Sequence, residues 1–250
     1  MRSRQSLGDG LYTVVLKVGG AAVSDKATGE YFGEEVAKRL VRELRRDIRF
    51  VIVQGAGYIG HQIAMERRIS RLNDNQEAWA YLRYKIVEST MVTLRELVSN
   101  QFPAMYLPVN TMVRTRDGKI YKSDYSAIVD YLDRGFMPFM HSDGPIDTEM
   151  GLSVLSGDAI VSDISRSIGA KMAVYCSDID GIEMKDGSIV SRIDNLDPAG
   201  IIFRKSGMDV SGGIANKIAE ASASGVESYI ANLRKDGSLS EILGRIHADE

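Results

Sequence analysis

The chain has 250 residues, of which 44% are hydrophobic and 26% are charged, and its formal net charge is -3. This composition suits a globular protein with a substantial core, and the lack of a basic excess argues against nucleic acid as a partner. No apolar run is long enough to span a membrane, and the opening residues MRSRQSLGDG lack the apolar segment of a signal peptide. The single cysteine, Cys176, lies in an apolar run, which predicts a core position and fits a reducing compartment. We therefore expect a cytoplasmic protein without a membrane partner.

The first half of the chain alternates apolar strands with amphipathic helical patterns. Within the long pattern at 76–99, the expected core contacts are Trp79, Leu82, Ile86, Leu94 and Val98. In chain order we predict strand 12–18, a glycine-containing loop, helix 33–47, strand 49–54, helix 60–69, helix 76–99, strand 104–107, a hairpin around Asp117-Gly118, helix 125–134 and strand 136–140.

The second half repeats this alternation. We predict helix 158–168, strand 171–176, a loop with a hairpin over 177–190, helix 216–224, strand 227–231 and a short helical turn at 240–243. Strands separated by helices predict an α/β fold, a three-layer αβα sandwich around a mostly parallel sheet. No linker separates independent domains, so we expect a single domain over 1–250 with two packed lobes, about 1–155 and about 156–250.

The segment VIVQGAGYIGH contains the G-x-G-x-x-G pattern of dinucleotide-binding enzymes, at Gly55, Gly57 and Gly60. That fold also needs an acidic residue about 20 residues later, at the end of a strand. Here the corresponding stretch, 75–80, opens a helical pattern, and Glu77 therefore has the right charge in the wrong element. The context argues against NAD or FAD.

Glycines after a strand still allow backbone N–H groups to approach an anion. Two such turns occur, at Gly19-Gly20 and at 55–60, and a third glycine pair, Gly212-Gly213, precedes a predicted helix. Lys17 and Lys26 flank the first of these glycine segments, and Lys217 follows the third. Apolar neighbours in VVLKV place the stem of Lys17 in the core. Because phosphoryl transfer depends on positioning and on cations around the migrating group, the pattern indicates a phosphoryl-transfer site.

Five segments in order, VVLKVGGAAVSDK, VIVQGAGYIGH, LSGDAI, SDIDGI and DVSGGIANK, resemble the amino acid kinase superfamily over nearly the whole chain. Within it, Lys26 and His61 are most similar to the pattern of isopentenyl phosphate kinases. The resemblance implies the amino acid kinase fold, ATP with Mg²⁺, a phosphorylated small-molecule acceptor, a role in isoprenoid biosynthesis and a homodimer. It implies no metal-ligating residues.

The resemblance also implies roles for individual residues. Lys17 would bridge the phosphates during transfer, Lys26 would hold the transferred group, and Lys217 would neutralise the ATP phosphates. Asp158 would orient the lysines, although its position also suits a helix N-cap. His61 would contact the acceptor phosphate. The implied acceptor-binding residues are Gly20, Ala56, Gly60, His61 and Gly157, and the implied nucleotide-binding residues are Lys17, Gly19, Gly57, Asp178, Gly212, Gly213 and Lys217.

The sequence departs from the superfamily pattern at Gln54, Ala21 and Ala56, where His, Ser and Gly are usual. None of these changes removes a cation, so they put the acceptor in doubt rather than the kinase activity. The alternatives are a phosphonate like fosfomycin, a furan-type phosphate, UMP, or a non-catalytic protein of the same fold that binds nucleotides or oxyanions. We expect an apolar tail pocket formed by Met65, Ile69 and the start of the long helix, and we interpret His141 and His247 as structural or surface residues.

Overall fold

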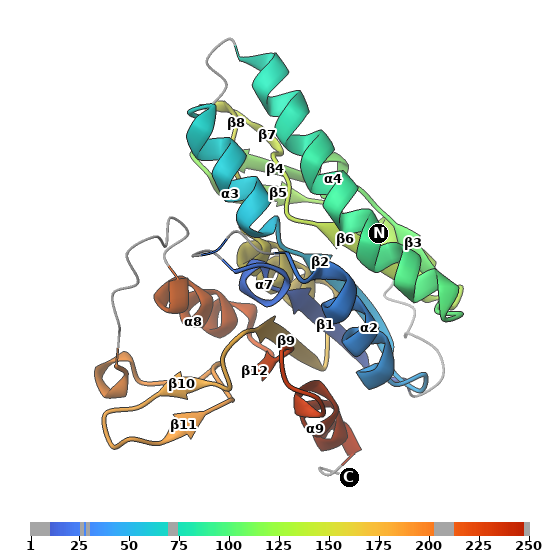
Figure 1. Cartoon of the computed structure of the whole chain (residues 1–250), viewed down its shortest axis with the longest axis vertical. Helices are drawn as coiled ribbons and strands as arrows, with labels where there is room; N and C mark the ends of the chain where they lie inside the picture. The colour runs from blue at the N-terminus through green and yellow to red at the C-terminus, as the bar shows by residue number, and fades with distance from the viewer. Residues whose placement is uncertain (1–10, 26–27, 29–30, 70–74, 203–212, 248–250) are drawn as a thin grey trace, which may run out of the picture.

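The computed structural model describes residues 11–25, 28, 31–69, 75–202 and 213–247. Within these residues, six strands form a parallel sheet in the order β12-β9-β1-β2-β6-β3 (Figure 1). The strands are β1 (Thr13–Val18), β2 (Arg49–Gln54), β3 (Ala104–Tyr106), β6 (Met137–His141), β9 (Met172–Ser177) and β12 (Glu227–Asn232). All strands point the same way, so their carboxyl ends meet along one edge of the sheet, where open α/β sheets bind ligands.

Both faces of the sheet are covered by helices, and successive residues of β1 point to opposite faces. Val14, Leu16 and Val18 pack in one core with three helices, α2 (Gly33–Glu43), α9 (Ser238–Gly244) and the end of α4 (Gln76–Ser99). Val15 packs in the other core with α6 (Ser126–Leu132), α7 (Gly157–Ile168) and α8 (Gly213–Ser224). The predicted sandwich of a mostly parallel sheet between two helix layers is confirmed.

A smaller layer extends beyond the carboxyl edge of the sheet. Figure 1 shows that this layer consists of α3 (Gly57–Glu66), the first half of α4 and a second sheet, which has four strands. That sheet consists of β4 (Val113–Arg116), β5 (Lys119–Ser123), β7 (Ile146–Asp147) and β8 (Gly151–Leu152). Ile63, Trp79, Leu82 and Leu152 pack together between these parts.

The remaining elements are short. They are α1 (Gly20–Val23), α5 (Val109–Met112), β10 (Ile182–Glu183), β11 (Ile189–Val190), η1 (Pro198–Gly200) and η2 (Arg245–His247). The hairpin expected around Asp117-Gly118 is present as β4 and β5, and the one expected over 177–190 is present as β10 and β11.

Several predicted boundaries and one predicted core contact were wrong. The expected loop after β1 opens with α1, α2 ends at Glu43 rather than at 47, and α3 begins at Gly57 rather than at Gly60. On α4, Val98 is 54% exposed and Leu97 is fully buried instead. The buried positions of α4, which are 78, 79, 82, 86, 89, 90, 93 and 97, lie on one side of the helix, and Val98 lies outside that side.

Candidate active site

Two lysines and one carboxylate from three separate elements meet under the carboxyl edge of the sheet. Lys17 Nζ lies 2.6 Å from Asp158 Oδ1, and Lys217 Nζ lies 3.1 Å from the same oxygen. Lys17 shares the face of β1 on which α7 and α8 pack, which brings it to Asp158 on α7 and Lys217 on α8. The structure thus unites Lys17, Asp158 and Lys217, three residues that sequence reasoning assigned to one site.

Burial shifts the protonation equilibria of this cluster. Burial, followed by the charge of Lys217, lowers the pKa of Lys17 to about 8. Burial alone would raise the pKa of Asp158, but the charges and hydrogen bonds of Lys17 and Lys217 outweigh it and lower that pKa to about 2. At neutral pH the carboxylate is ionised, and two ammonium groups against one carboxylate leave an excess positive charge suited to binding phosphates.

The start of α7 explains the position of Asp158. Ser156 is the N-cap, because its hydroxyl accepts a hydrogen bond from the Ala159 N–H at 3.2 Å. Asp158 therefore lies in the first turn, where the helix dipole favours a negative charge. The N-cap alternative for Asp158 is wrong, and its side chain is available to hold the two lysines.

The glycine loops after β1 and β2 touch each other through their backbones. A side chain added at Gly20 would place its Cβ 2.8 Å from the Gly57 Cα, and one added at Gly55 would place it 3.0 Å from the Gly20 nitrogen. Gly57 also has a φ of +66°, which favours glycine. Gly19 and Gly55 have structural roles: their N–H groups donate to Cys176 O and Val18 O. The two predicted phosphate loops thus form one continuous backbone surface after β1 and β2.

The described residues that were predicted to bind the nucleotide include Asp178, just after β9, and two residues of α8, Gly213 and Lys217. Gly213 opens α8 with a φ of +53°, and Asp178 is exposed just after β9. Lys217 lies in the second turn of α8, with Nζ 5.2 Å from the ring centre of Tyr175. Lys26 and Gly212 lie outside the described residues, so their predicted roles stay predictions.

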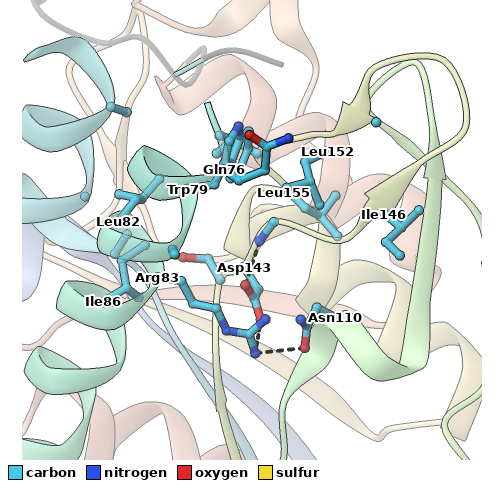
Figure 2. A pocket seen from close by; sticks show the side chains of 18 of the residues that line it. Gln76, Trp79, Leu82, Arg83, Ile86, Asn110, Asp143, Ile146, Leu152 and Leu155 are labelled. Atoms are coloured by element: carbon cyan, nitrogen blue, oxygen red, sulfur yellow. Dashed lines mark hydrogen bonds and ion pairs between the residues drawn. The ribbon is translucent and has the colours of Figure 1, made fainter. Parts of the chain in front are cut away.

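A cavity of about 450 Å³ opens between α3, α4 and the segment that connects β6 to α7 (Figure 2). Its lining is mainly apolar and consists of Ala56, Gly60, His61, Ala64, Gln76, Trp79, Ala80, Leu82, Arg83, Ile86, Asn110, Ser142, Asp143, Gly144, Ile146, Gly151, Leu152, Val154 and Leu155. One end adjoins the lysine cluster, because a Cβ on Gly157 would lie 3.2 Å from Lys17 Cε and 3.8 Å from Ser142 Cβ.

The cavity contains three of the predicted acceptor residues. Ala56, Gly60 and His61 line it, whereas Gly20 and Gly157 adjoin the lysine cluster and the glycine loops. His61 lies in the second turn of α3 rather than in its first, because the helix begins at Gly57. The expected tail residue Met65 is 56% exposed and outside the lining, with Ala64 in its place, and Ile69 is buried in the cluster behind. The start of α4 contributes as expected.

A polar group in the same cavity was missed by the sequence reasoning. Arg83 Nη2 donates to Asn110 Oδ1 at 2.9 Å and lies 3.3 Å from Asp143 Oδ2, as Figure 2 shows. A signal was present in the sequence, since Arg83 interrupts the apolar side of α4 next to Leu82 and Ile86. Its partners come from distant segments, and no local pattern pairs them.

The other two histidines were expected to be structural or surface residues, and His141 is buried at the end of β6. Its Nδ1 lies 2.7 Å from Ser142 O, so Nδ1 is the donor, and Nε2 accepts from the Tyr106 hydroxyl at 2.7 Å. Burial lowers the pKa of His141, in keeping with this neutral tautomer. The structural interpretation of His141 is confirmed. Cys176 is fully buried, as predicted.

In the described part of the chain, no helix has both the length and the apolar character needed to cross a bilayer. Among the same residues, no three side chains of histidine, cysteine, aspartate or glutamate lie together in a group able to hold a metal ion.

Comparison with known proteins gives a consistent picture. The model of the Amino acid kinase family matches residues 12–232. An isopentenyl phosphate kinase from Methanothermobacter thermautotrophicus is 27% identical over 92% of this chain and 94% of that protein. One from Haloferax volcanii is 29% identical over 87% of this chain and 90% of that protein.

Solved structures share the fold. A structure described as an isopentenyl phosphate kinase superposes with a TM-score of 0.74 at 24% identity, over 94% of this chain and 96% of that one. The product complex of the T. acidophilum isopentenyl phosphate kinase superposes with a TM-score of 0.68 at 23% identity, over 95% of this chain and 97% of that one. The predicted resemblance is confirmed, and the chain belongs to the amino acid kinase family and is a phosphotransferase.

Proposed function

We propose that this enzyme transfers the γ-phosphoryl group of ATP to isopentenyl phosphate and forms isopentenyl diphosphate. The observation that carries the proposal is the junction of two features: a buried pair of lysines on one carboxylate, and a mainly apolar cavity that opens beside it. The first suits phosphates in transfer, and the second suits a short hydrocarbon tail. The names of the relatives support the same substrate.

In this proposal an oxygen of the acceptor phosphate attacks the γ-phosphorus, and the bond from that phosphorus to the β,γ-bridging oxygen breaks to release ADP. Lys17 stabilises the charge on the migrating group, and Lys217 that on the nucleotide phosphates. Asp158 holds both ammonium groups in place. The acceptor is already an anion, so the reaction needs no general base to remove a proton.

The remaining assignments belong to the same proposal. His61 donates to the acceptor phosphate from the cavity wall, and Lys26 holds the transferred group. Residues 1–155 would form the acceptor lobe and 156–250 the nucleotide lobe, with Asp178, Gly212 and Gly213 near the nucleotide. Mg²⁺ would accompany ATP, held largely by phosphate oxygens and water, as is usual for this ion. We also propose a cytoplasmic homodimer that acts in isoprenoid biosynthesis.

The test is a measurement of ADP release from ATP and Mg²⁺ with isopentenyl phosphate, dimethylallyl phosphate, UMP or fosfomycin as acceptor. We expect turnover with isopentenyl phosphate and weaker or no turnover with UMP, whose polar base and ribose do not match the apolar cavity. Turnover restricted to UMP or fosfomycin would overturn the proposed acceptor. Nucleotide binding without turnover on any acceptor would support the non-catalytic alternative.

A further inference from the structure

Arg83 is a charged residue in a cavity that otherwise suits a hydrocarbon. Its side chain is 39% exposed and lines the cavity, while the side chain of its ion-pair partner Asp143 is only 3% exposed. Asp143 Oδ1 accepts a hydrogen bond from the Gly144 N–H at 2.7 Å, and its Oδ2 is buried. The carboxylate is therefore enclosed behind the guanidinium, and Arg83 is the member of the pair that a ligand can reach.

Asn110 and Asp143 hold the guanidinium of Arg83 through one of its nitrogens. Nη2 makes the contacts with both Asn110 and Asp143, and Tyr106 lies beside the same guanidinium. Because arginine carries several N–H donors in a rigid plane, it can keep these partners and still donate to an anion. A planar, fixed cation of this kind is suited to phosphate oxygens.

The position of Arg83 along the cavity indicates which part of a ligand it meets. In Figure 2 the guanidinium lies beside Asp143 and Asn110, away from Gln76 and Leu152. Asp143 directly follows Ser142, whose N–H donates to Gln54 O at the carboxyl end of β2. Ser142 also lies beside Gly157 and, through it, the Lys17 side chain. Arg83 thus contacts Asp143, the residue next to Ser142, and Ser142 stands at the phosphoryl-transfer end of the cavity.

We propose that Arg83 binds the phosphate of the acceptor and orients it for attack, with Asp143 and Asn110 as positioning residues. This inference rests on the proposed function, in that the acceptor is an organic monophosphate. It adds a cation to the acceptor side of a site whose lysines serve the migrating group and the nucleotide. The guanidinium would also supply hydrogen-bond donors for a phosphate in a cavity whose lining is mainly apolar.

The experiment is a calorimetric titration of the full chain with isopentenyl phosphate, methyl phosphate and isopentenol. Arg83→Gln keeps a donor without the charge, and Arg83→Lys keeps the charge. We expect Arg83→Gln to lower the affinity for isopentenyl phosphate and for methyl phosphate by about 10- to 150-fold, the range for a hydrogen bond to a charged group. Isopentenol, which has the tail without the phosphate, should bind as before, and Arg83→Lys should recover part of the loss.

Two controls keep the result interpretable. Arg95→Met removes a 63% exposed arginine from the same helix and should change none of the three affinities. If loss of the ion pair leaves Asp143 buried and unpaired and Arg83→Gln unfolds, the double variant Arg83→Gln/Asp143→Asn removes that charge too.

The outcomes separate the two proposals. An unchanged affinity for methyl phosphate in a folded Arg83 variant would overturn the role of Arg83 in phosphate binding. The same holds if the affinity for isopentenol falls as much as the affinity for isopentenyl phosphate. Failure of wild type to bind methyl phosphate would overturn it as well. Wild type that binds methyl phosphate through Arg83 but does not turn over isopentenyl phosphate would overturn only the proposed acceptor.

Discussion

Lys17 Nζ and Asp158 Oδ1 lie 2.6 Å apart although 141 positions of the chain separate the two residues. One stands near the end of the first strand, and the other in the first turn of α7. Both side chains are nearly buried, so the pair is fixed by the packing of α7 on the sheet. A buried pair that also engages a second lysine is a preorganised charge array, which is the main requirement for phosphoryl transfer.

Replacing Lys17 by Met should reduce kcat by on the order of 10²–10³, because one electrostatic contact to the transition state is lost. The fold should persist, since Asp158 keeps its contact with Lys217 at 3.1 Å. Steady-state kinetics and a thermal melt measure the two effects. Lys235→Met, at a lysine whose side chain is 62% exposed, is the matched control and should retain full activity. Normal turnover in Lys17→Met would remove Lys17 from the mechanism.

The value of kcat/KM should fall as pH rises through about 8, because burial and the charge of Lys217 lower the pKa of Lys17 to about 8. The sign follows from charge: above this pKa the lysine is neutral and no longer stabilises the phosphates. Asp158→Asn removes the anion that raises the pKa of Lys17, so the fall should move to lower pH. An identical profile in wild type and Asp158→Asn would contradict the coupling.

His61→Ala should raise the KM of the acceptor and lower kcat, with a combined effect on kcat/KM of about 10- to 150-fold, the range for a hydrogen bond to a charged group. The reason is the place of His61 in the cavity wall, near Gly60 and Ala56. His61→Gln, which keeps a donor, should retain part of the activity. The KM of ATP should change little in either variant. An equal rise in the KM of the acceptor and in the KM of ATP would indicate a structural role instead.

Gly20→Ala should disrupt the site, because the new Cβ would lie 2.8 Å from the Gly57 Cα and 2.9 Å from its nitrogen. Backbone atoms cannot move aside as a flexible side chain can, so the two glycine loops must separate. We expect a lower kcat and a lower melting temperature. Gly244→Ala is the control, since a Cβ there meets nothing within 4 Å. Equal behaviour of the two variants would show that contact between the loops is unimportant.

The layered fold could be predicted because its signals are local. Apolar strands alternate with amphipathic helices, and this alternation specifies a parallel sheet whatever the details of packing. Short elements escaped prediction: α1 and α5 have four residues each, too few to show a helical period. Tertiary packing, rather than local propensity, stabilises such single turns.

Part of the site could also be predicted, because some of its residues have local sequence signals. Lys17, Asp158 and Lys217 stand beside recognisable glycine loops, and the sheet brings those loops to one edge. Arg83 is visible as a charge on the apolar side of α4, but no local pattern pairs it with Asp143, because that contact depends on how α4 packs against the segment after β6. Met65 was misplaced because the packing of α3, which no local pattern specifies, decides which side of the helix faces the cavity.

The most direct test of the proposed function is ³¹P NMR of a reaction that contains the full-length chain, ATP, Mg²⁺ and isopentenyl phosphate. The account predicts that the monophosphate resonance of isopentenyl phosphate is replaced by the paired resonances of a diphosphate as ADP appears, and that the Lys17→Met variant leaves the spectrum nearly unchanged. ADP formation accompanied by inorganic phosphate, with the isopentenyl phosphate resonance intact, would contradict it.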